Sequence, residues 1–471
     1  MAKQITTLRD QFLLRGSWWI RDNNHNVIPG TLSFDPEDTT KLILDGTLRP
    51  ADSTSLPIGH FQTPCVFGNT IDGKACTIVG AFESKSQTNM PCKISTELIG
   101  DQVLIGGTHI DPSETQFESA LINLTDFGGW MSRDPFTDSH DESSTTVSYS
   151  LPELIKFTVN SLDSEVSISP NFNSNNSYQA RSFTHLDNIR IKPTERKGLA
   201  WYTEVTFKIR ILFGLLVGRP IFLNRVQLCT NAELIGENDQ KWRRDYVDLC
   251  IRQQGTPPKR EFLPPEVPFP YPKIADQFCS ILENWFSKSE DLNTVYSLFF
   301  GMTVDQSIPT EFQFIAVIQA LESYHRTKGD DIYLPENEYQ TIRDALTKAI
   351  PRDTPTDLRA SLKSRINFGN EYALRKRLTK TMDKLPEEMK TVITDGDANF
   401  ISKVVDTRNY LTHRDESQND NVFQFREMFN ATSNLQLLVQ FILLTEIGIP
   451  SAMVSDVMRN HRIFANRPRI I

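Results

Sequence analysis

An arginine and a histidine five positions apart, Arg408 and His413, are the residues whose types and spacing suggest chemistry. They begin and end the segment Arg-Asn-Tyr-Leu-Thr-His. Arginine is a permanent cation whose planar fork matches phosphate oxygens, and histidine takes and gives protons near pH 7. Together they suit attack of a ribose 2′-OH on the adjacent phosphate, with histidine moving a proton and arginine stabilising the developing charge.

The spacing of the two residues raises a geometric question. Five residues along an ideal helix turn through about 500°, which leaves the side chains roughly 140° apart. Either the helix ends near Leu411 and His413 turns back, or the long Arg408 side chain wraps round, or each residue works with its counterpart in a second copy of the chain. Both types are also favoured near a helix C-terminus by the helix dipole, so a purely structural role stays open.

Helices must position this motif. After about residue 305 apolar residues recur every three or four positions, which predicts a bundle of amphipathic helices. The motif falls near the end of the fourth of these helices. Their expected ranges are 310–328, 336–350, 358–385 in two pieces around Gly369, 387–413 and 422–448.

The N-terminal half has a different pattern. From about 16 to 172, short apolar runs alternate with turn signals such as Pro29-Gly30 and Asp72-Gly73, which predicts an antiparallel β domain, either a sandwich or a barrel. The polar segments 133–145 and 170–178 are expected to be surface loops. The long apolar segment 201–229 is interpreted as a helix, although its first residues alternate like a strand.

A proline-rich segment, 255–272, separates the two halves. Proline fixes φ and lacks an amide donor, so neither a helix nor a central strand persists there. We therefore expect an α+β protein with a β-rich sensor or regulatory domain at 1–255, a strap and connecting helix at 256–304, and an all-α bundle at 305–471.

Composition limits the classes of function. With 59 Asp+Glu against 50 Lys+Arg, the 471 residues carry a net charge of -9, so any nucleic acid must meet a local basic patch. No apolar run reaches the ~20 residues that a bilayer needs, and no signal peptide is evident, which favours a cytoplasmic protein. The six cysteines form no C-x-x-C pair and are expected to be buried free thiols. We expect no metal and no cofactor.

Several segments resemble one family. Residues 408–413 match the Arg-x4-His motif of HEPN proteins, with the polar Asn409 after the arginine. The segments ALESYHR (320–326) and LLVQFILLTEIGI (437–449) resemble the first and last helices of the ApeA-like branch, and the β-rich half with Trp285-Phe286 resembles its N-terminal domain. The chain is thus similar to the ApeA-like HEPN proteins of bacterial anti-phage defence.

The resemblance implies a metal-independent endoribonuclease that acts as a toxin in abortive infection. It implies a homodimer, or a higher homo-oligomer, in which Arg408, Asn409 and His413 of both copies face one cleft. The products would carry 2′,3′-cyclic phosphate and 5′-hydroxyl ends, and tRNA and mRNA are the candidate substrates. A phage protein acting on the N-terminal domain would be the trigger.

Further residues are candidates for supporting roles. Glu322 and Asp406 could orient the Arg/His pair. Segment 355–384 carries eight basic and three acidic residues, 8 − 3 = +5, and its expected RNA contacts are Arg375, Lys376, Arg377 and Lys380. Two alternatives stay open: a HEPN bundle that binds RNA or protein without catalysis, and a separate enzyme in the β half that uses Asp138, Asp141 or Glu142.

Overall fold

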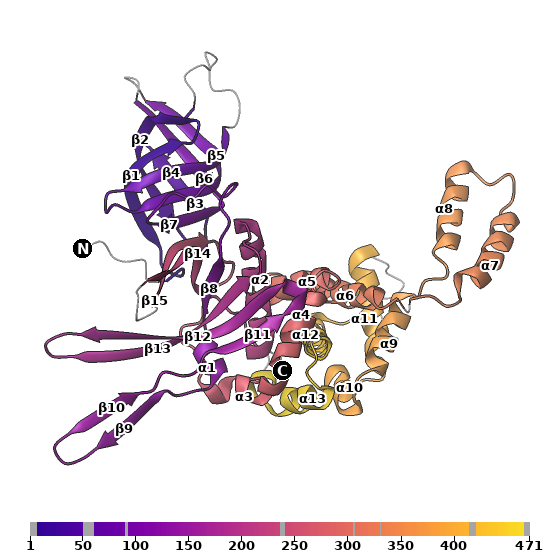
Figure 1. Cartoon of the computed structure of the whole chain (residues 1–471). Coiled ribbons are helices and arrows are strands. Elements are labelled where there is room, and N and C mark those ends of the chain that lie inside the picture. The colour runs from indigo at the N-terminus through magenta and orange to yellow at the C-terminus, as the bar shows by residue number, and fades with distance from the viewer. Residues whose placement is uncertain are drawn as a thin grey trace. The chain divides into compact units, whose positions relative to one another are not determined.

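The computed structural model describes residues 7–49, 61–89, 93–235, 241–304, 307–329, 331–413 and 421–465. The chain divides into two compact units, Met1–Ser287 and Lys288–Ile471. The first unit is rich in strands and the second is helical (Figure 1). The predicted α+β class is therefore confirmed.

The first strands of the N-terminal unit close an antiparallel barrel. In the order β5-β4-β1-β2-β3-β6 each strand pairs with the next, and β6 pairs back with β5. Trp18 is fully buried in its core. A Cβ on Gly68 would lie 2.2 Å from the Trp18 ring, so only glycine fits there. The strands are β1 Phe12–Ile20, β2 Asn23–Phe34, β3 Thr40–Leu44, β4 Gln62–Thr70, β5 Ala75–Asn89 and β6 Lys93–Gly100.

Further strands extend the sheet beyond the barrel. β7 follows β6 along the same edge of β5, and the order then continues β15-β14-β8-β13-β12-β11. One edge of β5 therefore pairs with β6 of the barrel and with β7 of the outer sheet, so β5 belongs to both. These strands are β7 Gln102–Gly106, β8 Ser119–Leu124, β11 Ile155–Val159, β12 Ser164–Asn176, β13 Arg181–Pro193, β14 Leu223–Ile235 and β15 Lys241–Ile251.

The two predicted loops of this unit are instead hairpins. β9 Phe136–His140 pairs with β10 Thr145–Tyr149, and most of 170–178 belongs to β12, which pairs with β13. Aromatic rings interleave with the polar residues and stack across the strands, with Tyr149–Phe172 and Phe172–Phe183 centroids 4.3 and 5.7 Å apart. The loops were predicted from the polar residues of these segments, whereas the strands are stabilised by aromatic side chains that contact each other across them.

A helical layer and the proline-rich strap complete the unit. The predicted helix at 201–229 is confirmed only for α2, Leu199–Val217, because β14 begins at Leu223. The strap lies so close to α1, Phe127–Met131, that a Cβ on Gly129 would come within 2.2 Å of the Phe262 carbonyl oxygen. It leads through α3, Tyr271–Ile274, to α4, Phe278–Ser287. Short 3-10 turns are η1 Asn160–Leu162, η2 Pro264–Glu266 and η3 Ala275–Gln277.

The second unit is a helical bundle built around α6 and α12, which pack on each other and contribute buried residues such as Phe314, Leu321 and Leu438. The predicted helix 387–413 is wrong as a single element, because Asp395 and Gly396 both have positive φ and end α10. The other predicted helices are confirmed. The helices are α5 Asn293–Val304, α6 Thr310–Thr327, α7 Glu336–Ala349, α8 Thr356–Asn367, α9 Leu374–Asp383, α10 Glu387–Thr394, α11 Phe400–His413, α12 Phe425–Glu446, α13 Ser451–Asn460 and α14 Arg462–Ala465.

Helices α7 and α8 form a hairpin that stands away from the other helices of this unit (Figure 1). Tyr339 is the buried residue of α7, and α8 has none. At the base, Ile332 and Glu371 form a β-bridge, and the Asn370 side chain exchanges hydrogen bonds with the main chain of Leu334. The hairpin therefore enters and leaves the bundle at one point.

Within the described ranges, no helix combines the length and the apolar character that crossing a bilayer requires. Cys65, Cys76, Cys229 and Cys250 are buried free thiols, as expected, whereas Cys279 is exposed. Cys92 lies outside the described residues.

Candidate functional site

The Arg-x4-His motif lies on the last turns of α11, which runs without a break through His413. The histidine therefore does not turn back after Leu411. On this helix the two Cα positions are about 7.5 Å apart along the axis and roughly 140° apart around it. Val404 and Thr407 are buried on the inner face of the helix, whereas Arg408 is half-buried and His413 is exposed.

Neither side chain of the motif is held by a strong partner. Arg408 Nη1 donates to Asn409 Oδ1 over 3.3 Å, and no carboxylate among the described residues pairs with the guanidinium. Within the same residues, the side chain of His413 makes no hydrogen bond or ion pair. Both groups thus keep donors and acceptors for a bound molecule.

Asp406 was expected to orient the Arg/His pair, but its carboxylate faces elsewhere. Its Oδ1 pairs with Arg375 of α9 over 3.1 Å. Its Oδ2 accepts from Asn421 and from Ser402. Asp406 therefore ties α11 to α9 and to the segment that precedes α12.

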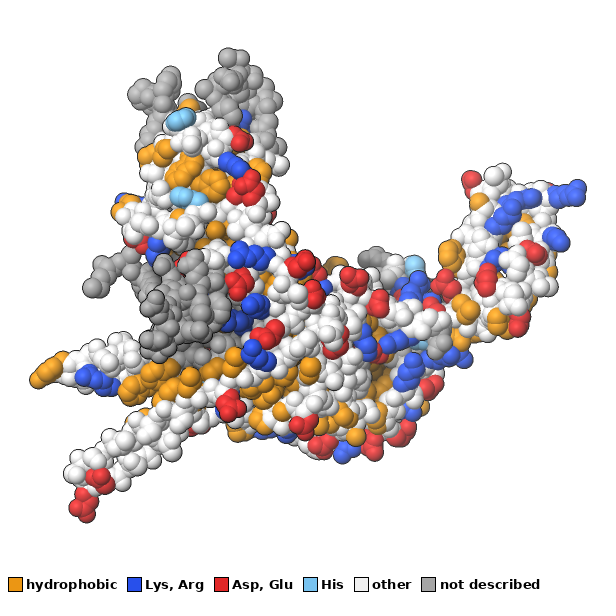
Figure 2. Space-filling model, in the orientation of Figure 1, with side chains coloured by type: hydrophobic (Ala, Val, Ile, Leu, Met, Phe, Trp, Pro, Cys, Tyr) orange, Lys and Arg blue, Asp and Glu red, His pale blue; other side chains and the backbone are white. Residues whose placement is uncertain are grey.

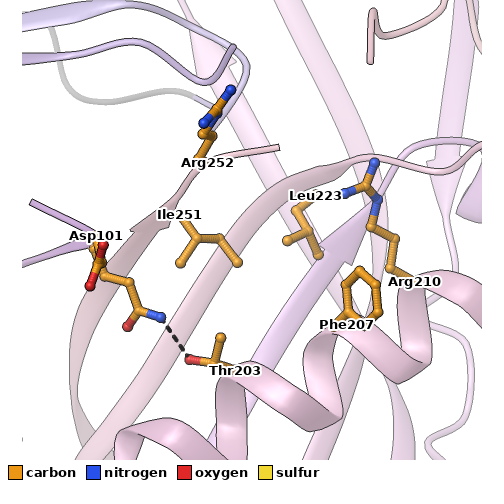
Figure 3. A pocket seen from close by; sticks show the side chains of 8 residues that line it. Asp101, Thr203, Phe207, Arg210, Leu223, Ile251 and Arg252 are labelled. Atoms are coloured by element: carbon orange, nitrogen blue, oxygen red, sulfur yellow. Dashed lines mark hydrogen bonds between the residues drawn. The ribbon is translucent and has the colours of Figure 1, made fainter. Parts of the chain in front are cut away.

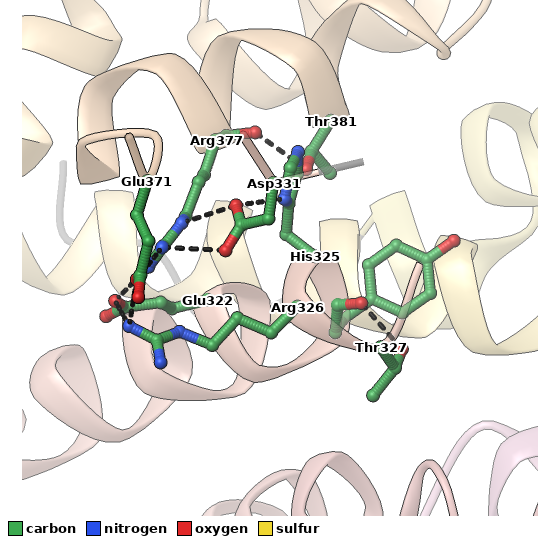
Figure 4. A network of polar contacts seen from close by, with 9 residues as sticks. Glu322, His325, Arg326, Thr327, Asp331, Glu371, Arg377 and Thr381 are labelled. Carbon is green, nitrogen blue, oxygen red and sulfur yellow. Dashed lines mark hydrogen bonds and ion pairs between the residues drawn. The ribbon is translucent and has the colours of Figure 1, made fainter. Parts of the chain in front are cut away.

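Arg377 was expected to contact RNA, yet it is only 3% exposed. Its Nη1 lies 2.6 Å from Glu322, its Nε 2.8 Å from Asp331 and its Nη2 3.1 Å from Glu371 (Figure 4). The guanidinium is thus surrounded by carboxylates, and Arg377 does not fit the RNA-binding role. Glu322, expected near the Arg/His pair, is a partner of Arg377 instead.

His325 and Arg326 join the same network (Figure 4). His325 Nδ1 lies 3.1 Å from Asp331 Oδ1. Burial lowers the pKa of His325 and outweighs the opposing effect of Asp331. Arg326 reaches Glu322 over 3.6 Å. The network fastens α6 to α9.

A second polar cluster, which is partly exposed, links the end of α6 to α12. The Glu446 carboxylate accepts from Tyr324 Oη over 2.7 Å, from Lys328 Nζ over 2.6 Å and from Lys288 Nζ over 3.0 Å. Burial alone would raise the pKa of Glu446, but these donors outweigh it and hold the pKa at about 2. Sequence reasoning missed this cluster, although the acidic residue inside an apolar run was a usable signal.

The remaining basic candidates lie on the outer face of α9. Arg375 and Lys376 are exposed and Lys380 is half-buried. Lys376 and Lys380 lie 5.9 and 4.6 Å from the centre of the Tyr372 ring, a spacing that suits cation–π attraction. Lys and Arg side chains gather where α9 and α11 lie (Figure 2). Helix α9 packs against α11, the helix that carries Arg408 and His413.

The acidic candidates of the β half occupy the β9–β10 hairpin. Asp141 accepts hydrogen bonds from the Ser143 and Ser144 amides over 2.9 and 2.8 Å. These bonds, with those from the serine hydroxyls, lower its pKa to about 2. Asp141 thus caps a tight exposed turn, which gives no support to a separate enzyme here. Among the described residues, no group of three or more His, Cys, Asp or Glu side chains is placed to hold a metal ion.

The fold and the motif define an α+β protein whose helical unit displays an Arg/His pair at the end of one helix. A family model described as ApeA N-terminal domain 1 matches residues 14–285, more than half of the chain. A second, described as Apea-like HEPN, matches residues 315–452. The chain therefore belongs to the ApeA-like HEPN family. No curated protein and no solved structure gave a significant match.

Proposed function

We propose that this protein is a metal-independent HEPN endoribonuclease that acts in anti-phage defence by abortive infection. Arg408 and His413 carry the chemistry, and Asn409 positions the Arg408 fork. RNA is cut by attack of the 2′-OH on the adjacent phosphate, which leaves 2′,3′-cyclic phosphate and 5′-hydroxyl ends. Membership of the ApeA-like HEPN family supports the defence role.

One observation carries the catalytic assignment. Of the described arginines on α6, α9 and α11, Arg326, Arg375 and Arg377 are each paired with carboxylates. Arg408 has no such partner among the described residues, and the side chain of His413, at the end of the same helix, makes no hydrogen bond or ion pair with them either. An unneutralised guanidinium and a proton carrier are the two kinds of group that a phosphate-transfer site needs.

The active form in this proposal is a homodimer or a higher homo-oligomer. Transesterification needs one group to deprotonate the 2′-OH and another to protonate the 5′-oxygen, and a single histidine does not suit both roles in one step. Because Arg408 and His413 point about 140° apart on a regular helix, a second copy is the simplest source of the complementary groups. The N-terminal unit would receive the phage trigger.

The test compares cleavage by the full-length protein and its variants, with the RNA ends identified. We expect His413→Ala to slow cleavage by about 10²–10⁴-fold and Arg408→Ala by at least as much. Arg408→Lys should recover only part of the rate, because it keeps the charge and loses the fork. EDTA should leave wild-type cleavage unchanged.

Arg365→Ala on α8 is the matched control, since Arg365 is exposed and makes no side-chain contact that the structure describes. It should cleave at the wild-type rate. Wild-type cleavage by His413→Ala would contradict the catalytic role. Retained RNA binding without any cleavage by wild type would instead support a non-catalytic RNA-binding HEPN module.

A further inference from the structure

A pocket of about 210 Å³ opens within the N-terminal unit, where the barrel adjoins α2 (Figure 3). Thr203, Phe207 and Arg210 of α2 form one wall. Leu223 and Ile251, from the start of β14 and the end of β15, add apolar surface, and Asp101 and Gln102 come from the junction of β6 and β7. Arg252 completes the lining.

Arg210, which lines this pocket, is a buried cation. No carboxylate among the described residues neutralises it. Its side chain is 7% exposed. Nε donates to the Ile221 carbonyl over 2.5 Å and Nη2 to the Gln254 carbonyl over 3.2 Å. Its Nη1 makes no hydrogen bond with any described residue, and none of their carboxylates pairs with the guanidinium.

Burial without a counter-charge has an energetic consequence. Burial lowers the pKa of Arg210 to about 10, which still leaves the side chain charged at pH 7. A buried charge without a counter-charge is costly. Arg377, the other buried arginine among the described residues, is by contrast surrounded by carboxylates. A bound anion would remove this cost at Arg210.

The lining also limits the size and charge of an occupant. The volume of about 210 Å³ is smaller than the ~300 Å³ or more of drug-sized sites. Arg210 and Arg252 against Asp101 give a net charge of 2 − 1 = +1, which matches a monoanion. Phe207, Leu223 and Ile251 suit a short hydrocarbon tail.

We propose that this pocket binds a small organic monocarboxylate, whose carboxylate pairs with the free edge of the Arg210 guanidinium and whose short aliphatic part lies against Phe207, Leu223 and Ile251. The ligand would join the barrel to α2 inside the N-terminal unit. This site is separate from the Arg408/His413 chemistry and does not depend on it.

The test uses hexanoate as the probe, with the full-length protein and calorimetric or NMR detection. Hexanamide, which has the same shape without the charge, and butyl phosphate, a dianionic alternative, serve as comparisons. We expect hexanoate to bind and the other two to bind at least ten-fold more weakly. Equal binding of hexanoate and hexanamide, tighter binding of butyl phosphate, or no binding of hexanoate would overturn the proposal.

Substitutions in the pocket lining test whether hexanoate binds in this pocket. Arg210→Met removes the charge while keeping an apolar side chain of similar length, and should weaken hexanoate binding by about 10–100-fold, the range for charged hydrogen bonds. Arg196→Met is the control, because Arg196 also donates to a backbone carbonyl but lies outside the pocket lining. If Arg210→Met does not fold, Thr203→Met, which fills the pocket and leaves Arg210 intact, should abolish binding. Wild-type affinity in a folded Arg210→Met or Thr203→Met variant would refute the assignment.

Discussion

Adjacent residues on α9 have opposite environments. Lys376 is exposed, whereas Arg377 is buried among Glu322, Asp331 and Glu371. One residue on a helix is a 100° rotation, which is enough to move a side chain from the outer to the inner face. A count of charges along the segment cannot separate the two residues. The apolar stripe through Leu378 could have done so, because Arg377 falls beside it.

This difference predicts two effects on stability. Arg377→Ala leaves three carboxylates without their shared cation, and we expect it to lower the free energy of unfolding by about 3–5 kcal/mol, the usual cost of breaking a buried ion pair. Lys376→Ala should stay within about 0.5 kcal/mol of wild type. Urea denaturation of both variants measures the difference, and equal midpoints would refute the assigned role of Arg377.

The candidate catalytic residues were predictable from the sequence, while their surroundings were not. Arg408 and His413 lie five positions apart, so their pattern is visible in the sequence itself. Asp406 is only two residues from Arg408, yet it pairs with Arg375, 31 positions away in the chain. Such partners depend on how helices pack, which a single sequence does not specify.

At the scale of elements, the outer face of α9 is the candidate surface for the RNA backbone. Lys376→Gln combined with Lys380→Gln should weaken RNA binding and lower the slope of log K against log salt by about 0.7 for each phosphate of a single strand that is no longer neutralised. The pair Lys348→Gln and Lys363→Gln, on the α7–α8 hairpin, is the control and should leave the slope unchanged. Filter binding at several salt concentrations measures both. An unaltered slope in the α9 variant would assign this face to solvent.

The link between α6 and α12 predicts a pH dependence. The folded-state pKa of Glu446, about 2, lies below its ordinary value of 4.5. Its contribution to stability is therefore present above about pH 4.5 and is lost as the pH falls toward 2. Glu446→Gln should lower the free energy of unfolding by about 1–3 kcal/mol at pH 7, and this difference should shrink toward zero near pH 2.

Denaturation of wild type and Glu446→Gln at pH 7, 4 and 2.5 follows this difference. Glu387→Gln, at an exposed position on α10, is the control. A deficit of Glu446→Gln that is constant across the series would show that the carboxylate charge is not its cause.

Elements differed in how well the sequence predicted them. Long periodic helices such as α6 and α12 were predictable because their apolar stripes face one core. The break between α10 and α11 was missed although Asp395-Gly396 is the same kind of turn signal as Asp72-Gly73, and both Asp395 and Gly396 have positive φ. The sequence left a sandwich and a barrel as alternatives, because closure depends on β6 pairing back with β5, a pairing that no local pattern reveals.

At the scale of the whole molecule, the proposed oligomer makes a complementation prediction. Chains with Arg408→Ala and chains with His413→Ala, unfolded and refolded together, should form mixed dimers that retain one arginine and one histidine. We expect cleavage slower than wild type but measurably faster than either variant alone. Sedimentation confirms the assembly. A strict monomer that still cleaves RNA, or a mixture no faster than its components, would contradict the shared site.

The β-bridge between Ile332 and Glu371 has an evolutionary consequence. It brings the two ends of the α7–α8 hairpin together. The roughly forty residues between them therefore span no more distance in the bundle than a short loop would. Insertions and losses are tolerated best where the affected backbone contributes little to a core, and α8 contributes no buried residue. A lineage can therefore lengthen, shorten or exchange this hairpin without compensating changes in α6, α9 or α12, and the hairpin is free to diversify at a different pace from the helices that carry Arg408 and His413.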